Sequence, residues 1–255
     1  MKSRSKVLGI VERLRNQHPA ADTELAYRNA YELLVATVLS AQTTDQRVNQ
    51  VTPALFARFP DARALASADP NELERLVQPT GFFRQKARAL IGMANGLVDR
   101  HGGRVPADMD ALVRLPGVGR KTANVVLGHA LGVAGLAVDR HVLRVANRIG
   151  LAGSDDPEVV ERQLTAVLPE DLWTLTSDTL ILHGRRICKP RPLCDRCAVR
   201  QDCDFFREGR VAALAAAPQP RRRRRPAEPG EAGASGAPAG QAGVKAHRDR
   251  PRKQR

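Results

Sequence analysis

Residues 115–126 read LPGVGRKTANVV. The proline, the valine and the two glycines make a tight turn, and a helix-compatible apolar run follows it. Because a helical pattern at 108–114 precedes the turn, the segment predicts a helix, a glycine-rich hairpin and a second helix. Glycine permits positive φ and close backbone approach, so the N–H groups of such a hairpin and of the next helix's first turn can bind one phosphate oxygen. An ordinary corner between two helices also uses glycine and is the alternative.

Arg120 and Lys121 begin the helix that follows the hairpin, where the helix dipole disfavours positive charge. In that positive potential a larger fraction of the lysine amine is neutral and nucleophilic. A lysine that keeps its charge and binds phosphate is the alternative. Asp139 comes just before the next apolar-periodic helix, where a plain N-cap would also stand. An amine and a carboxylate at two helix N-termini form the pair that covalent attack at a sugar carbon needs.

Helical spacing of apolar residues recurs along the chain between turns that contain Pro or Gly. No alternating pattern predicts a pair of strands. The sequence therefore predicts an all-α fold of about ten helices with short connections. The expected helices cover 5–17, 31–42, 46–58, 71–78, 84–100, 108–114, 121–132, 139–149, 156–167 and 171–184.

The basic residues are unevenly distributed. Residues 211–255 hold 11 basic and 3 acidic residues, whereas residues 1–210 hold 30 and 24. Ala, Pro, Gly and Arg without apolar periodicity predict a disordered basic tail at 211–255. The charge favours a polyanionic partner, most often nucleic acid. The alternative is a soluble protein whose basic tail binds other molecules only non-specifically. Neither a signal-peptide core nor a run of about 18 apolar residues occurs, so we expect a cytosolic protein without a membrane span.

All four cysteines of the chain lie in one short segment with the spacing C-x5-C-x2-C-x5-C. In a reducing compartment disulfides are not expected, and four thiolates so close together indicate a metal site. Zinc sites made of cysteines usually use two close pairs. Because only one pair is close here, the spacing favours a 4Fe–4S cluster over zinc. The expected ligands are Cys188, Cys194, Cys197 and Cys203.

Over about residues 5–207 the sequence resembles the endonuclease III family of DNA glycosylases, within the helix-hairpin-helix superfamily. The resemblance rests on LSAQTTD (39–45), TGFFRQKA (80–87), LPGVGRKTANVVL (115–127), VDRHVLRV (138–145), ILHGRRIC (181–188) and the four-cysteine segment. It implies two helical domains that flank a DNA-binding cleft. One is a six-helix barrel at 23–133, and the other combines 1–22 with 134–210 around the cluster.

The resemblance also implies the activity and its residues. It implies a bifunctional DNA glycosylase and AP lyase of base excision repair, which removes oxidised pyrimidines from double-stranded DNA. Lys121 matches the nucleophile that forms a Schiff base before β-elimination at the abasic site, and Asp139 matches the catalytic carboxylate. A monomer that acts on the nucleoid in a bacterial cytoplasm is expected. The expected DNA contacts are Gln42, Phe82, Gly117, Val118, Gly119, Arg120, Arg140, His141, Lys189 and Arg191.

Three positions depart from the family pattern. Five residues separate the first two cysteines where the family commonly has six, Arg140 stands where Thr is frequent, and Phe82 stands where Leu is usual. Packing of Phe82 and Phe83 in the core is the alternative to a role in DNA. Two other functions also stay open: an adenine-type monofunctional glycosylase of the same superfamily, and a non-catalytic DNA-binding helical protein with a structural metal. Lys121 argues against both.

Overall fold

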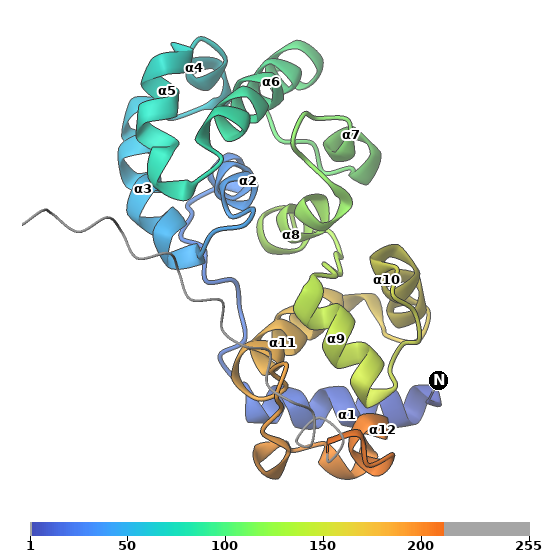
Figure 1. Cartoon of the computed structure of the whole chain (residues 1–255). Coiled ribbons are helices and arrows are strands. Elements are labelled where there is room, and N and C mark those ends of the chain that lie inside the picture. Colours follow the sequence, from blue (N-terminus) through green and yellow to red (C-terminus); the bar gives the residue numbers. More distant parts are fainter. Residues whose placement is uncertain (1, 212–255) are drawn as a thin grey trace, which may run out of the picture. The chain divides into compact units, whose positions relative to one another are not determined.

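The computed structural model describes residues 2–211, and every regular element in that range is helical (Figure 1). The all-α fold predicted from the sequence is therefore confirmed for these residues. The predicted basic tail, apart from Val211, lies outside the described part of the chain. The α-helices are α1 (Arg4–Gln17), α2 (Ala30–Leu39), α3 (Asp45–Arg58), α4 (Ala62–Ala66), α5 (Pro70–Val77), α6 (Phe83–His101), α7 (Met109–Val113), α8 (Arg120–Ala130), α9 (Arg140–Ile149), α10 (Pro157–Thr165), α11 (Trp173–Arg186) and α12 (Asp204–Arg207). The 3-10 turns are η1 (Gln78–Thr80), η2 (Glu170–Leu172), η3 (Cys194–Arg196) and η4 (Arg200–Asp202).

Two features of the helices differ from the sequence-based expectation. The second helix ends at Leu39 rather than at residue 42, because the chain turns through Ser40 into a left-handed conformation at Gln42. The short helices α4 and α12 were not predicted. Four or five residues are too few to show a 3.6-residue period, and α4 depends instead on Asp61, whose carboxylate accepts the N–H of Ala64 at 2.8 Å. Such N-caps stabilise a helix by about 1 kcal/mol.

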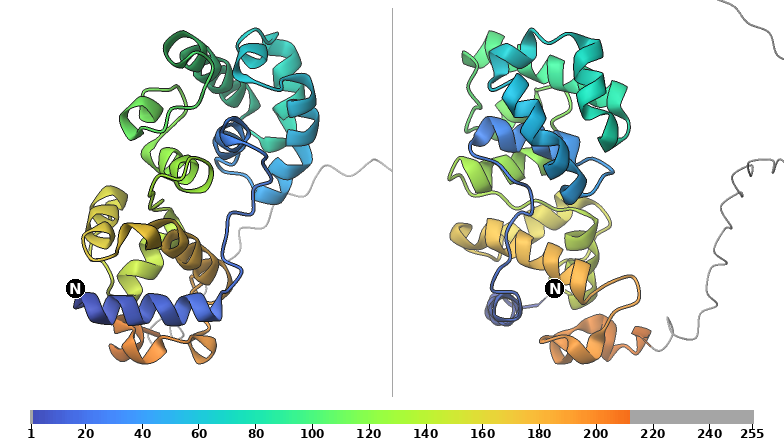
Figure 2. Two further views of the ribbon diagram at one scale, coloured as in Figure 1. Left: turned by 180° about the vertical axis from the view of Figure 1, so that it is seen from behind. Right: turned by 90° about the vertical axis from the view of Figure 1, so that its left-hand side faces the viewer.

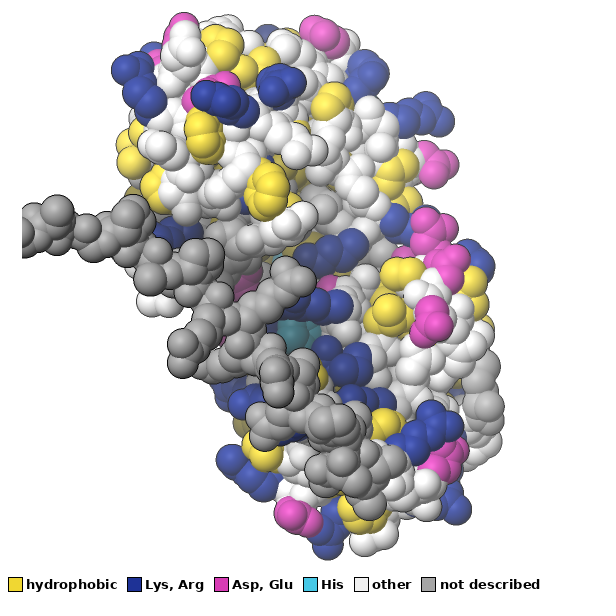
Figure 3. All heavy atoms as spheres, viewed as in Figure 1, with side chains coloured by type: hydrophobic (Ala, Val, Ile, Leu, Met, Phe, Trp, Pro, Cys, Tyr) yellow, Lys and Arg dark blue, Asp and Glu magenta, His cyan; other side chains and the backbone are white. Residues whose placement is uncertain are grey.

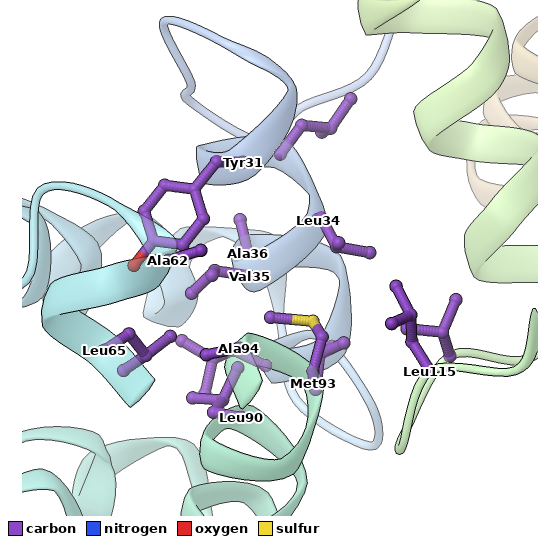
Figure 4. Close-up of a cluster of buried hydrophobic side chains, with 14 of the residues drawn as sticks. Tyr31, Leu34, Val35, Ala36, Ala62, Leu65, Leu90, Met93, Ala94 and Leu115 are labelled. Atoms are coloured by element: carbon purple, nitrogen blue, oxygen red, sulfur yellow. The ribbon is translucent and has the colours of Figure 1, made fainter. Parts of the chain in front are cut away.

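α2 is the centre of the first hydrophobic core. Nine of its ten residues are buried, which explains why its sequence is apolar on every side. α3, α6 and α8 contact it directly, and Figure 4 shows Leu34 and Val35 of α2 beside Leu90 and Met93 of α6. This core holds the base of the hairpin in place, since Leu115 and Val118 are both part of it.

A second hydrophobic core forms around α1, α9 and α11. The buried face of α1 consists of Val7, Ile10, Val11 and Leu14, which are spaced to lie on one side of the helix. Although α1 opens the chain, it lies against α11, more than a hundred residues away in the sequence (Figures 1 and 2). The chain thus starts in the second core with α1, forms the first core with α2 to α8, and returns to the second core after α8. The two cores lie on either side of the predicted domain boundaries, which themselves stay a prediction.

Within residues 2–211, no helix combines the length and the apolar character that crossing a membrane requires.

Candidate active site and cysteine centre

The hairpin between α7 and α8 is closed by its own backbone. The N–H of Val118 donates to the carbonyl of Leu115 at 3.1 Å, and Gly117 has φ 77°. A Cβ atom at Gly117 would lie 2.8 Å from the Cβ of Ala89 on α6. Both the backbone conformation and the close approach to α6 therefore require glycine at this position.

α8 starts directly from the hairpin without a side-chain cap. Its N-cap residue is Gly119, which offers no side-chain acceptor to the first-turn N–H groups. The first N–H groups of a helix have no partner within the helix, and they carry the positive end of the helix dipole. The hairpin and the first turn of α8 thus present N–H donors of the kind that bind an anionic phosphate.

Lys121 and Asp139 line the same pocket, which has a volume of about 70 Å³. Lys121 is exposed in the first turn of α8, and Asp139 is the half-buried N-cap of α9. The Oδ1 atom of Asp139 accepts the backbone N–H groups of His141 at 2.7 Å and Val142 at 2.8 Å. Two bonds to one oxygen fix the carboxylate while its other oxygen stays available. The predicted amine and carboxylate are therefore brought together at two helix N-termini.

Arg120 does not stand next to Lys121 as a free cation, which corrects the sequence-based argument. Its guanidinium makes a bidentate ion pair with Glu161 of α10, with N–O distances of 2.9 and 2.7 Å. Glu161 therefore offsets much of the positive charge that Arg120 would add at Lys121. The sequence contained no signal for this pair, because the two residues lie on separate elements. A DNA contact by Arg120 stays a prediction.

Arg185 of α11 joins two acidic residues at the edge of the same pocket. Its guanidinium bonds to Glu24 at 2.5 Å and to Asp45 at 2.9 Å. Asp45 starts α3, so this ion pair connects α11 to a helix of the first core. All three residues line the pocket with Lys121. The wall of the pocket is consequently polar and fixed in place, and sequence reasoning did not identify it.

His129 of α8 lies between two carboxylates in the wall of this pocket. Its Nδ1 atom is 3.4 Å from Asp22, and its Nε2 atom is 3.3 Å from Asp178 of α11. Burial lowers the pKa of His129, but the two carboxylates raise it by more, so the pKa lies above its ordinary value. The imidazole therefore links α8, α11 and the segment after α1.

Gln42 and Phe82 are the two non-glycine residues in the described range with positive φ, at 56° and 47°. Residues other than glycine rarely adopt this backbone conformation, and those that do are concentrated at functional sites. Phe82 is 61% exposed, so the alternative that it packs in the core is wrong. Phe83 is half-buried and packs against the edge of the first core. The structure thus exposes both of the side chains predicted to enter DNA.

The other predicted DNA contacts lie on and around α9. Arg140, His141 and Lys189 line a broad hollow of about 740 Å³ together with Arg144 and Arg185. Arg191 is exposed in the neighbouring cysteine loop. Figure 3 shows Lys and Arg side chains gathered on this face of the molecule. The surface has the positive charge that phosphate binding requires, and Arg144 is a member of it that sequence reasoning missed.

The four cysteines line one cavity between α9, α11 and α12. Burial raises the pKa of Cys197 to about 11, and it raises those of Cys194 and Cys203 as well. A bound metal cation stabilises the thiolate form, which is the form that ligates a metal. Four sulfurs on one zinc ion would lie about 3.8 Å apart, but in residues 2–211 no three of the cysteine sulfurs lie within 4.8 Å of one another. The donor set therefore fits a larger metal centre than a single ion.

Two buried histidines form a chain of contacts that ends at Cys197. His18 Nε2 is 3.0 Å from His183 Nδ1, and His183 Nε2 is 3.6 Å from the sulfur of Cys197. Burial lowers the pKa of His183 to about 4, so the ring is neutral. His183 therefore orients Cys197 from α11, while His18 supports the ring from the end of α1. These two histidines are far apart in the sequence, which gave no signal of their contact.

The shortened loop between the first two cysteines is held by Arg148 of α9. Its guanidinium donates to the carbonyl oxygens of Lys189 at 2.7 Å and Pro190 at 3.0 Å, and it stacks on the ring of Phe205 at 4.5 Å. The loop keeps a defined path with five residues because these carbonyls have fixed partners.

A glycine hairpin before an uncapped helix, with a polar pocket at its N-terminus, indicates the class of helix-hairpin-helix DNA-binding proteins. The model of that class, described as the HhH-GPD superfamily of base excision DNA repair proteins, matches residues 35–170. Among characterised relatives, endonuclease III of Synechocystis sp. is 49% identical over 192 residues, which are 74% of this chain and 88% of that protein. Endonuclease III of Rickettsia conorii is 44% identical over 198 residues, which are 77% and 94% of the two chains. The chain therefore belongs to the endonuclease III family.

Solved structures agree with this assignment. A trapped covalent intermediate of endonuclease III with DNA is 38% identical, has a TM-score of 0.78, and is similar over 82% of this chain and 100% of that chain. A non-covalent complex of endonuclease III with DNA has a TM-score of 0.77 at 38% identity, over 82% and 99% of the two chains.

Proposed function

We propose that this member of the endonuclease III family, a bifunctional DNA glycosylase and AP lyase of base excision repair, uses Lys121 as its nucleophile. The observation that carries the proposal is the shared pocket of Lys121 and Asp139 at the N-termini of α8 and α9. A monofunctional glycosylase needs no amine at this position. The proposed substrates are oxidised pyrimidine nucleotides and abasic sites in double-stranded DNA.

The reaction starts when the damaged nucleotide is turned out of the duplex. Breaking its stacking and pairing costs a few kcal/mol, and the cost is lower for a damaged base than for an intact one. The neutral amine of Lys121 attacks C1′ of the sugar, and the bond from C1′ to the base breaks with the electron pair leaving on the base. Asp139, fixed by two backbone N–H groups, stabilises the positive charge that develops on the sugar or accepts the amine proton. The sugar ring then opens: the bond from C1′ to the ring oxygen O4′ breaks, O4′ takes up a proton, and the nitrogen of Lys121 forms a double bond to C1′, which is the Schiff base.

The Schiff base then allows strand cleavage. It makes the C2′ proton acidic, because the electron pair left on C2′ is delocalised into the iminium. Removal of that proton expels the 3′ phosphate by β-elimination, and water releases the product from Lys121. The enzyme amine is restored at the end of this sequence, so no co-reactant besides water is needed.

We propose that the remaining site residues hold the duplex. The hairpin Gly117–Val118–Gly119 and the first turn of α8 would bind one phosphate through N–H groups. Phe82 would unstack a base pair and Gln42 would occupy the space left by the extruded base, which their exposed, left-handed positions support. Arg120, Arg140, His141, Lys189 and Arg191 would supply phosphate contacts.

We propose that Cys188, Cys194, Cys197 and Cys203 hold a 4Fe–4S cluster. Their common cavity and the separation of their sulfurs support this assignment. Bound there, the cluster would cross-link the loop that carries Lys189 and Arg191. Purified protein should contain about four irons per chain and absorb near about 400 nm, whereas colourless protein with one zinc would reverse the choice.

We also propose two domains, 23–133 and 1–22 with 134–210, which the two separate hydrophobic cores support. A DNA substrate and bacterial relatives support a place on the nucleoid in a bacterial cytoplasm.

Lys121→Gln tests the nucleophile. This variant should still bind a duplex that contains thymine glycol, but borohydride trapping and strand cleavage should be lost. Lys6→Gln is the matched control, since it removes an exposed lysine of α1 that lies outside the pocket and the proposed DNA contacts, and it should keep trapping. Undiminished trapping by Lys121→Gln would exclude Lys121 as the nucleophile.

A further inference from the structure

Lys86 is a buried lysine near the start of α6. Its side chain is 5% exposed, and none of the acidic side chains in residues 2–211 forms an ion pair with it. Its Nζ atom donates instead to the backbone carbonyls of Leu39 and Thr80, both at 2.8 Å. A buried ammonium is unfavourable unless its donors are paired, so these two hydrogen bonds decide where the side chain lies.

The two carbonyls belong to the C-terminal ends of two different elements. Leu39 is the last residue of α2, and Thr80 is the last residue of η1. Carbonyls at the end of a helix lack partners within it and carry the negative end of its dipole. The ammonium therefore caps both ends at once and joins them. The backbone N–H of Lys86 also donates to the carbonyl of Phe82 at 3.0 Å.

Within three residues of each capped end stands a non-glycine residue whose backbone is left-handed. Leu39 precedes Gln42 (φ 56°), and Thr80 precedes Phe82 (φ 47°). Such conformations persist only where the surrounding structure holds them. A single buried group is thus bonded to the base of both strained loops.

We propose that Lys86 is a positioning residue for lesion recognition, which sets the spacing between the Gln42 loop and the Phe82 loop. The inference rests on the proposed function, in which both side chains enter the duplex around the extruded nucleotide. Lys86 acts through the two loops and is too deeply buried to contact DNA itself. Binding to undamaged DNA depends on the hairpin and the basic surface, so it does not depend on this spacing.

Lys86→Met tests the proposal, because methionine keeps an unbranched chain and removes the N–H donors. The measurement is the ratio of dissociation constants for an undamaged duplex and for the same duplex with a stable abasic-site analogue. This ratio should fall about tenfold, which equals about 1.4 kcal/mol. Affinity for the undamaged duplex should stay within about twofold of wild type. Lys86→Arg keeps donors for two carbonyls and should restore part of the ratio.

Leu90→Ala separates this role from general destabilisation. Leu90 is fully buried on the same helix and contacts neither carbonyl through a hydrogen bond, so this variant should be less stable but should discriminate as wild type does. An unchanged ratio in Lys86→Met, or an equal loss in Leu90→Ala, would overturn the proposal. If Lys86→Met does not fold, Lys86→Gln is measured in the same way with the same expectation. Absence of a borohydride-trapped adduct in the wild type would count against the proposed function and not against the role of Lys86.

Discussion

Gly117→Ala should destabilise the protein through two additive effects at one turn. An alanine at φ 77° adopts the left-handed conformation, which costs about 1–2 kcal/mol. Its Cβ would lie 2.8 Å from the Cβ of Ala89, and this overlap with a short, rigid side chain costs about 1–3 kcal/mol. We therefore expect the free energy of unfolding to fall by about 2–5 kcal/mol, and the melting temperature to fall by roughly 4–20 °C.

Urea unfolding followed by helical circular dichroism measures this loss, and Gly119→Ala is the control in the same hairpin. Gly119 has φ −93°, and a Cβ there would meet nothing within 4 Å. The slightly poorer N-cap and the less flexible unfolded chain oppose each other, so this variant should stay within about 1 kcal/mol of wild type. A loss below about 1 kcal/mol for Gly117→Ala, or equal losses for the two variants, would refute the reasoning.

Three further predictions concern binding and pH. Phe82→Ala should leave the free energy of unfolding within about 0.5 kcal/mol of wild type, because the ring is mostly exposed. Its affinity for a lesion-containing duplex, measured by fluorescence anisotropy, should fall about tenfold. A loss of stability without a loss of affinity would contradict the role of Phe82 in DNA binding. Because the pKa of His129 is raised in the folded protein, its stabilising effect is complete below about pH 6.5 and is lost as the pH rises through the raised pKa. His129→Asn should therefore lower stability by about 1 kcal/mol at pH 6 and by less at pH 9, and an equal loss at both pH values would exclude the imidazolium. A chain cut after Arg210 lacks the whole predicted tail, so its affinity for undamaged DNA should be lower and less steeply dependent on salt, by about 0.9 in logarithmic slope per lost phosphate contact. Equal slopes would show that the tail does not touch DNA. The single-turnover rate of the cut chain on saturating lesion DNA should match that of the full chain.

Much of the fold could be predicted from local sequence, because long helices record their buried face in a 3.6-residue period. α1 and α9 show this most clearly, and their observed bounds differ from the predicted ones by a single residue. The end of α2 could not be placed in the same way, since no glycine or proline follows Leu39 directly, and hydrogen bonds to the last carbonyl oxygens of the helix fix its end there. One of those contacts comes from Lys86 in a different helix.

Site residues with a local signature could also be predicted, as with Lys121 after the hairpin and Asp139 before α9. Their partners could not. The pairing of Arg120 with Glu161, and of His18 with His183, joins residues on separate elements, and only the tertiary fold brings them together. A single sequence therefore predicts the basic residue of a motif as a free cation, because the motif gives no signal of the acid that faces it.

The position of α1 has a consequence during synthesis of the chain. Its apolar face, formed by Val7, Ile10, Val11 and Leu14, is buried in the second core, where α1 contacts α11. About 155 residues must be added after Gln17 before Trp173 of α11 is made, which takes roughly ten to thirty seconds on a ribosome. During that time the first core can fold alone, whereas the exposed stripe of α1 is a surface to which chaperones or other nascent chains can bind. The protein should therefore aggregate more readily when translation is slowed after α8 than when it is slowed before α8. Slowing after α8 lengthens the interval in which the first core is complete and the second core lacks its last helices.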